Sequence, residues 1–323
     1  MRRLNLILLG LALVSAGCSN NNFDPGSEIE SVRILATRAE PPYAAPGATV
    51  RMDTLAFDGR AKRLAPMVLS WIPIPCINPA GDAFYACFPR FAEAFHPGVD
   101  LTPALTSGTS FSFQMPSNVI ATHLGSRGQG PYGLAVVFTI ACAGHVEYMP
   151  PAAGASPDAL PFGCFDAGGA ALGPNDFVFA YALVYAFTGR TNANPVIDHV
   201  TFGGAAVDAD AGIAVAHCTK SSIDACPATD LQTILPDSDQ ELDPGDTDTN
   251  GNVLKEEVWV DYYVTAGKVK NDTIVVFDPH TGRLANTADP FYSPQSSGAS
   301  TLWAVAHDNR GGVSWVELGV HAR

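Results

Sequence analysis

One segment of the sequence carries oxygen-bearing side chains at the spacing that calcium-binding loops use. Asp246, Asp248, Asn250 and Asn252 stand at alternate positions, and Glu257 follows five residues later. Calcium takes six to eight oxygen ligands at about 2.3–2.6 Å, and alternate residues of a tight loop can bring such oxygens to one point. We therefore expect these five residues to hold a structural calcium ion, with Asn252 contributing its backbone carbonyl and Glu257 closing the site.

The flanks of this loop differ from those of a helix–loop–helix calcium site. Pro244 opposes a regular helix before the loop, and the chain after the loop alternates like a strand. Glu257 would lack the helix that aims the last ligand of an EF-hand, so Glu256 or Asp243 can take its place. The alternative is a solvated acidic loop between two strands.

The N-terminus predicts export. Met1-Arg2-Arg3 is basic, residues 4–14 are mostly apolar, and small residues precede Cys18. This order is typical of a secretory signal peptide, and the apolar run is about half of what a membrane-spanning helix needs. The alternative is an ordinary secretory signal with Cys18 nearby by chance.

The ending Val14-Ser15-Ala16-Gly17-Cys18 resembles the lipobox of bacterial lipoproteins. The resemblance implies cleavage before Cys18 and attachment of acyl chains such as palmitate to its sulfur. Several acyl chains hold a protein on a bilayer where a single chain does not. We expect residues 1–17 to be the signal peptide and residues 18–30 to be a lipidated, flexible tether. Ser19 after the anchor favours the outer membrane of a bacterial cell envelope.

Six cysteines remain after Cys18, and an even number in an exported chain predicts disulfides. Six cysteines allow 15 connectivities. We favour pairing between neighbours, because each pair brackets a loop rich in Gly, Pro or Asp. The three predicted pairs are Cys76–Cys87, Cys142–Cys164 and Cys218–Cys226. A zinc site is the alternative, but no Cys-x-x-Cys spacing occurs.

Composition narrows the classes of partner. The chain has 323 residues, is 47% hydrophobic and carries a formal net charge of −14. Such a chain can bury sizeable cores, and its acidic balance argues against nucleic acid as a partner. The membrane, reached through the lipid anchor, and an envelope protein or glycan are the partners that remain.

Short apolar and β-branched runs, separated by turn residues, predict an all-β fold. The runs are residues 32–37, 49–57, 67–72, 111–116, 132–142, 177–187, 196–202, 258–264, 273–277, 301–306 and 313–320. Residues 191–195 have the composition of a joint between domains. We expect two β-sandwich domains, at residues 31–190 and 191–323, and expect Val258, Val260, Tyr262 and Val264 to share one face.

Two stretches carry a resemblance to bacterial extracellular immunoglobulin-like domains. In the first domain, Pro46 to Val50, Trp71 and the run from Tyr132 to Val137 resemble such a domain. In the second, Leu302 to Trp315 is similar to the closing hairpin of modules of the polycystic-kidney-disease type. The resemblance implies a bacterial surface lipoprotein with tandem immunoglobulin-like domains. It supplies no catalytic residues.

The function expected from these features is non-catalytic: a calcium-stabilised, lipid-anchored binding, adhesion or scaffold module. The main alternative is a secreted carbohydrate-active protein, either hydrolytic or sugar-binding. Paired carboxylates in a groove would favour hydrolysis, and an exposed row formed by the four tryptophans and Tyr262 and Tyr263 would favour sugar binding. No common hydrolase or phosphate-binding motif occurs in the sequence.

Overall fold

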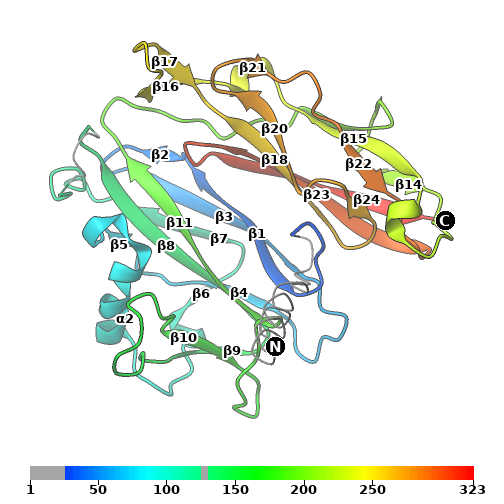
Figure 1. Cartoon of the computed structure of the whole chain (residues 1–323). Helices are drawn as coiled ribbons and strands as arrows, with labels where there is room; N and C mark the ends of the chain where they lie inside the picture. The colour runs from blue at the N-terminus through cyan, green and yellow to red at the C-terminus, as the bar shows by residue number, and fades with distance from the viewer. Residues whose placement is uncertain (1–25, 125–129) are drawn as a thin grey trace, which may run out of the picture.

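The computed structural model describes residues 26–124 and 130–323 and consists mainly of strands (Figure 1). The predicted signal peptide, Cys18 and residues 19–25 of the predicted tether lie outside the described residues. Within the described ranges, no helix has both the length and the apolar character needed to cross a bilayer.

The first unit is a sandwich of two sheets. One sheet has the order β1-β3-β7, with β1 at Val32–Glu40, β3 at Thr49–Asp58 and β7 at Ser110–Gln114. The other has the order β2-β11-β8-β4-β6, and β5 also pairs with β8. Its strands are β2 at Tyr43–Ala44, β4 at Val68–Trp71, β5 at Cys76–Ile77, β6 at Thr106–Ser107, β8 at Gly133–Cys142 and β11 at Phe177–Ala186.

Two insertions extend from this sandwich, and a disulfide links each of them to one of its strands. The first contains η1 (Ala80–Asp82), η2 (Phe84–Cys87), α2 (Phe88–Ala94) and η3 (Thr102–Ala104). The second is the hairpin of β9 (His145–Tyr148) and β10 (Phe162–Phe165). Cys76 of β5 bonds to Cys87 of η2, and Cys142 of β8 bonds to Cys164 of β10. With Cys218–Cys226 in the second unit, the predicted neighbour pairing is confirmed.

The second unit is also a sandwich. One sheet has the order β13-β12-β15-β22-β19, the other β14-β24-β23-β18-β20-β21, and β16 and β17 form a separate hairpin. The first sheet contains β12 (His199–Phe202), β13 (Ala205–Ala206), β15 (Ala228–Ile234), β19 (Lys268–Val269) and β22 (Asp289–Tyr292). The second contains β14 (Ile213–Val215), β18 (Val258–Val264), β20 (Thr273–Asp278), β21 (Gly282–Arg283), β23 (Gly298–Asp308) and β24 (Val313–Ala322). The remaining elements are η4 (Ile223–Ala225), η5 (Asp237–Asp239), β16 (Leu242–Thr247) and β17 (Val253–Lys255).

Both units have the strand order of an immunoglobulin-like fold. Immunoglobulin-like domains place strands A, B, E and D in one sheet and strands C, F and G in the other. The orders β1-β3-β7 and β4-β8-β11 match A-B-E and C-F-G in the first unit, and β12-β15-β22-β19 and β18-β23-β24 match A-B-E-D and C-F-G in the second. In each unit a short strand, β2 or β14, pairs in parallel with the last strand. The prediction of two all-β, immunoglobulin-like sandwiches is thus confirmed by topology.

The hydrophobic pattern of the strands explains this arrangement. Every residue of β8 is buried, because this strand lies in the middle of its sheet with both faces covered. In β18, buried and partly exposed residues alternate, with Val258, Val260, Tyr262 and Val264 on the buried face as predicted. Trp71, on the strand equivalent to C, is fully buried, as is the tryptophan at that place in antibody domains.

The two units are packed against each other and share apolar contacts (Figure 1). Leu35 of β1 lies in one buried cluster with Trp303 of β23, and Ala36 of β1 lies in another with Val305 of β23. The rings of Phe57 and Trp303 lie 4.8 Å apart, centroid to centroid. The outer face of the β1-β3-β7 sheet is thus covered by the second unit.

The last residues of the predicted tether belong to the folded body. Ile29 N donates to Val264 O at 3.1 Å, and Val264 N donates to Ser27 O at 2.8 Å. Ser27 and Ile29 are buried. Residues 27–29 run beside β18 and cross from one unit to the other, so they belong to the folded body and not to the tether predicted over residues 18–30.

Candidate functional site: a cleft between the two units

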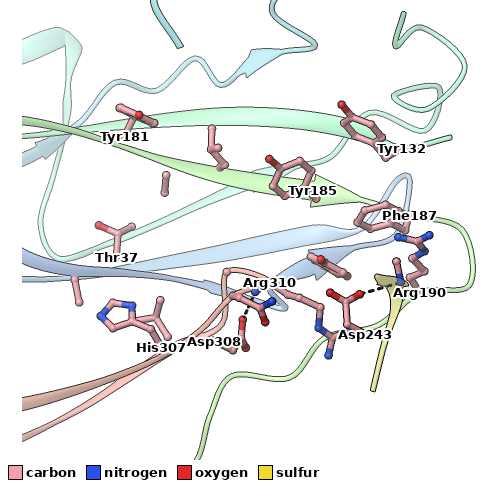
Figure 2. A pocket seen from close by; sticks show the side chains of 18 of the residues that line it. Thr37, Tyr132, Tyr181, Tyr185, Phe187, Arg190, Asp243, His307, Asp308 and Arg310 are labelled. Atoms are coloured by element: carbon pink, nitrogen blue, oxygen red, sulfur yellow. Dashed lines mark hydrogen bonds between the residues drawn. The ribbon is translucent and has the colours of Figure 1, made fainter. Parts of the chain in front are cut away.

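A cleft of about 790 Å³ lies where the two units meet (Figure 2). Residues 34–37 of β1 and 180–183 of β11 form two of its walls. The turn between β23 and β24, from His307 to Gly311, closes it from the second unit. Segments far apart in the sequence therefore build one site.

Aromatic side chains line one end of this cleft. The rings of Tyr43 and Phe187 lie 4.6 Å apart, and Tyr185 stacks on Phe187 at 6.3 Å. Tyr132 contacts both Tyr185 and Phe187. Tyr181 lies further along β11 and is 45% exposed. Tyr132 is buried, so Tyr43, Tyr181 and Tyr185 are the rings that offer a ligand both an apolar face and a hydroxyl group.

Arg310 holds the floor of the cleft together. Its Nε donates to Glu256 Oε1, its Nη2 donates to Glu241 Oε2 at 2.6 Å, and its Nη1 donates to Thr191 O at 3.2 Å. The guanidinium also lies 5.7 Å from the centre of the Tyr43 ring. Because the Arg310 side chain is only 3% exposed, all of its polar groups must be satisfied within the protein. This one side chain ties both carboxylates to the segment that joins the units.

Asp308 is the second buried charge at the joint. Its Oδ1 accepts hydrogen bonds from the backbone amides of Arg310 and Gly312, both at 2.8 Å, and its Oδ2 accepts one from Asn192 Nδ2 at 3.1 Å. A Cβ at Gly312 would lie 2.0 Å from Asp308 Oδ2. The close approach of this carboxylate to the backbone therefore requires glycine.

Burial perturbs the acid–base behaviour of these groups. Desolvation raises the pKa of Glu256 to about 7, against the lowering effect of its hydrogen bond to Arg310. Desolvation also raises the pKa of Asp308 and brings that of Tyr43 to about 12. Two carboxylates, those of Glu241 and Glu256, share the guanidinium of Arg310, and the Asp308 carboxylate is bonded to the Arg310 backbone amide.

Arg190 is a second cation at the cleft. Its guanidinium lies 5.0 Å from the centre of the Phe187 ring. Among the residues that the structure describes, no carboxylate lies within ion-pairing distance of it. A stacked, half-buried guanidinium of this kind suits a ligand carboxylate.

Asp246, Asp248, Asn250 and Asn252 lie on the hairpin of β16 and β17 and do not line the cleft, although Asp243 and Gly245 of β16 do. Asp248 Oδ1 accepts hydrogen bonds from the amides of Asn250 and Asn252, both at 2.8 Å, and Asp246 Oδ1 accepts one from Thr247 N. Glu257 lies beyond β17, where its amide and carbonyl pair with Asn309. In residues 26–124 and 130–323, no three His, Cys, Asp or Glu side chains gather as a metal site. The hairpin does not bring Asp246, Asp248 and Glu257 together, so coordination would require it to rearrange.

The exposed aromatic row that would have favoured sugar binding does not form from Trp71, Trp303 and Tyr262. Trp71, Trp303 and Tyr262 are buried in the cores of the two units. Trp259 stacks on His307 at the edge of the cleft, with their ring centroids 5.3 Å apart. The exposed aromatic side chains of the cleft come mainly from β11.

Sequence reasoning missed Arg310 and Glu241, and it named Glu256 only as a substitute calcium ligand. The alternation of buried and partly exposed residues along β18 could have predicted that Glu256 is buried, because position 256 lies two residues before the buried Val258 and on the same face. No comparable local signal marks Arg310 or Glu241, whose partners lie 54 or more residues away in the sequence.

Comparisons with known proteins do not decide the fold assignment, which rests on the sheet topology. No protein-family model matches the chain, and no curated protein matches it. Among solved structures, dimeric latent PorU from Porphyromonas gingivalis is 8% identical, with 92% of this chain and 24% of that chain covered and a TM-score of 0.23. The chain spans about a quarter of the length of PorU.

Two further structures have similar scores. The three N-terminal domains of the bacteriophage RB49 Highly Immunogenic Outer Capsid protein are 9% identical, with 90% of this chain and 69% of that chain covered and a TM-score of 0.22. The C-terminal domain of the Streptococcus agalactiae AgI/II polypeptide BspA is 10% identical, with 90% and 99% covered and a TM-score of 0.17. At these TM-scores the assignment of both units rests on their strand order alone.

Proposed function

We propose that this protein is a lipid-anchored, non-catalytic binding module of a bacterial cell envelope, and that its ligand site is the cleft between the two units. The observation that carries the proposal is the cleft itself. It is about 790 Å³ in volume, within the range of ligand pockets, and hydrogen bonds hold the side chains of Arg310 and Asp308 in place at its wall. Tyr181 and Leu183 expose apolar surface at its mouth.

The state of the carboxylates favours binding over hydrolysis. The two carboxylates that line the cleft are Asp243 and Asp308. Asp308 is 4% exposed and accepts hydrogen bonds from two backbone amides and Asn192. Asp243 Oδ1 accepts a hydrogen bond from Gly245 N at 2.9 Å. Because these contacts hold both groups in place as acceptors, we assign them a structural role and no role in acid–base catalysis.

The lipid anchor is supported by the sequence around Cys18. Replacement Cys18→Ser should move the protein from the membrane fraction to the soluble envelope fraction, while the matched variant Ser19→Ala should leave it membrane-bound. Mass spectrometry of the wild type should show an N-terminal diacylglyceryl cysteine. A mature chain with an unmodified thiol at this position would contradict the anchor.

Calcium enters the proposal through the spacing of Asp246, Asp248 and Asn250 alone. These residues lie on an exposed hairpin, so an ion would stiffen this hairpin and would not act in the cleft.

The cleft can be tested in cells with a photo-crosslinking amino acid placed at one position at a time. Leu183 lines the cleft and is 37% exposed, whereas Leu64 is 85% exposed and does not line it. We expect a discrete cross-linked product in the envelope fraction from position 183 and none of the same size from position 64. Identical patterns from the two positions would rule out the cleft as the binding site.

A further inference from the structure

One edge of β11 lacks a partner strand over most of its length. On one side, β11 pairs with β8 along all ten of its residues. On the other side, β2 pairs only with Tyr185 and Ala186. Within the described ranges, no strand pairs with this edge from Phe177 to Val184.

The hydrogen bonds at the two ends of this edge show which backbone groups are left open. Asn175 O accepts from Val32 N at 2.9 Å, and Phe187 N donates to Ala44 O at 3.1 Å. Backbone groups of a strand point to the same side at every second residue, and the pairing of β11 with β8 has no register shift. The N–H and C=O groups of the odd-numbered residues between these ends therefore point to the open edge. These residues are Phe177, Phe179, Tyr181 and Leu183.

The gap arises because the first strand of the unit changes sheets. Val32, at the start of β1, bonds to Asn175, just before β11. The rest of β1 pairs with β3 in the opposite sheet. The chain then returns as β2 and pairs with the C-terminal end of β11. Figure 2 labels Thr37 of β1 and Tyr181 of β11 among the side chains that line the cleft. The open edge forms one wall of the cleft.

The sequence of β11 makes this edge unusual. Phe177–Ala186 contains no charged residue and no proline. Natural proteins protect exposed edges with Lys, Pro or bulges, or cover them, because an unpaired apolar edge recruits other strands. Because β11 contains no Lys, Pro or bulge, we expect another segment to cover its edge.

Hollows on both sides of the edge can receive the side chains of such a cover. The cleft lies on one side, where Ala180 and Ala182 are small and leave room. On the other side lies an apolar groove of about 470 Å³, lined by Phe88, Leu160 and Phe179 among others. Tyr181 borders both hollows. Side chains of an added strand alternate between two faces, so one set would enter the cleft and the other the groove.

We infer that the open edge of β11 is a docking site for an extended peptide of a partner protein, which adds to the sheet as a parallel strand in line with β2. The inference rests on the proposed function and names its ligand class. Main-chain hydrogen bonds supply affinity in this mode of recognition, and pockets for alternate side chains supply specificity. The peptide is apolar at alternate positions, and its C-terminal end lies where β2 begins to pair with β11 at Tyr185.

The cleft geometry favours a peptide over a second copy of this chain. Residues 34–37 of β1 and the turn at 307–311 stand opposite β11 across the cleft. A single extended segment fits such a space, whereas a folded unit would also have to displace β1. The continuity with β2 gives the peptide its direction and its register.

The test uses a library of random ten-residue peptides displayed on phage, selected against the mature chain carrying Cys18→Ser. We expect enriched peptides to have apolar residues at every second position. Synthetic copies with N-methyl groups on the edge-facing amides should bind at least 10-fold more weakly, because they cannot pair with the β11 backbone. Unchanged affinity after N-methylation would overturn strand addition.

Variants of the protein provide a matched comparison. Tyr181→Pro removes the edge-facing amide without removing a bond to β8, and proline is tolerated at a strand edge, while Tyr181→Ala keeps that amide. We expect Tyr181→Pro to weaken binding at least 10-fold more than Tyr181→Ala does. Leu183→Lys, which adds an edge charge, should weaken binding if the proline variant fails to fold, and Tyr85→Ala, outside the cleft, should not. Equal affinity of Leu183→Lys and the wild type would refute the site.

Glycan binding separates this inference from the proposed function. An oligosaccharide array that yields a ligand sensitive to Tyr181→Ala, with no peptide enriched, would overturn strand addition and keep the cleft as a binding site. No peptide or glycan binding, together with identical cross-links from positions 183 and 64, would overturn both.

Discussion

Asn192 donates its side-chain amide to the carboxylate of Asp308, with Nδ2 3.1 Å from Oδ2, and both residues are buried. Asn192 belongs to the segment that leaves the first unit, and Asp308 ends the strand before the closing turn of the second. Two residues later, Asn194 Nδ2 donates to Ala39 O at 3.0 Å while its Oδ1 accepts from Val313 N at 2.8 Å. The joint is therefore bonded to both units.

Replacement of Asn192 by Ala should destabilise the protein by about 1.5–3 kcal/mol, because a buried hydrogen bond to a charged group is lost. Chemical denaturation would measure the change in the free energy of unfolding. Asn309→Ala is the matched control, since Asn309 is exposed and its side chain accepts only one bond, at 3.3 Å. Equal effects of the two variants would show that the joint contributes little.

Glu256 should make stability depend on pH in a direction opposite to that of an ordinary surface carboxylate. Burial raises its pKa from 4.5 to about 7, so between these values the folded state holds a proton that the unfolded state releases. The free energy of unfolding therefore falls as pH rises from about 4.5 to about 7. Relative to Glu256→Gln, which has no carboxyl to titrate, the wild type should lose up to about 3 kcal/mol over this range.

The measurement is a series of denaturation curves for both proteins between pH 4.5 and pH 8. Groups common to the two proteins cancel in the difference, which isolates residue 256. Glu257→Gln is the control, because no ion pair joins Glu257 to Arg310. A wild-type minus Glu256→Gln difference that stays flat with pH would contradict a raised pKa.

Gly312→Ala should destabilise the turn by about 1–3 kcal/mol, because the added methyl group must displace its neighbours. An ideal Cβ there lies 2.0 Å from Asp308 Oδ2 and 2.8 Å from Ala193 O. Gly173→Ala is the control, since nothing lies within 4 Å of its Cβ position. Thermal melts of the two variants test this prediction. If both variants had the melting midpoint of the wild type, the close approach of Asp308 to Gly312 would be contradicted.

Calcium should raise the melting midpoint modestly if Asp246, Asp248 and Asn250 bind it. For a dissociation constant on the order of 1 mM, typical of extracellular sites, 10 mM calcium stabilises the folded state by about 1.4 kcal/mol. Asp248→Asn should abolish the rise while keeping an oxygen for the turn amides. Asp208→Asn, in another exposed turn that caps its own amides, should retain it. An identical midpoint in calcium and in chelator would remove the ion from the loop.

Local patterns carried most of the fold prediction. Alternation along residues 258–264 identified β18 and its buried face, because side chains of a strand point to opposite sides whatever the rest of the chain does. Apolar continuity identified β8 and β11, and loop composition identified the disulfide partners. The small elements of the first insertion, such as α2, carried too little periodicity to be predicted.

Predictions about the sites were weaker, because a site depends on contacts between distant segments. Spacing selected Glu257 as a ligand, but the pleat of the strand places Glu256 on the buried side, where it meets Arg310. The acidic hairpin was visible from composition, whereas its geometry was not. Residues 27–29 looked like part of a polar tether and instead run beside β18.

The sequence by itself indicated the strand pattern and favoured the cysteine pairing that the structure shows, because both depend on neighbouring residues. The export signal and the anchor at Cys18 depend on the same kind of local pattern and stay predictions. Only the tertiary structure decided that the two units share a buried interface, that Arg310 gathers two carboxylates beneath a cleft, and that the edge of β11 stays open. The reason is physical: these features arise from contacts between residues tens to more than a hundred positions apart, and such contacts leave no periodic trace in the chain.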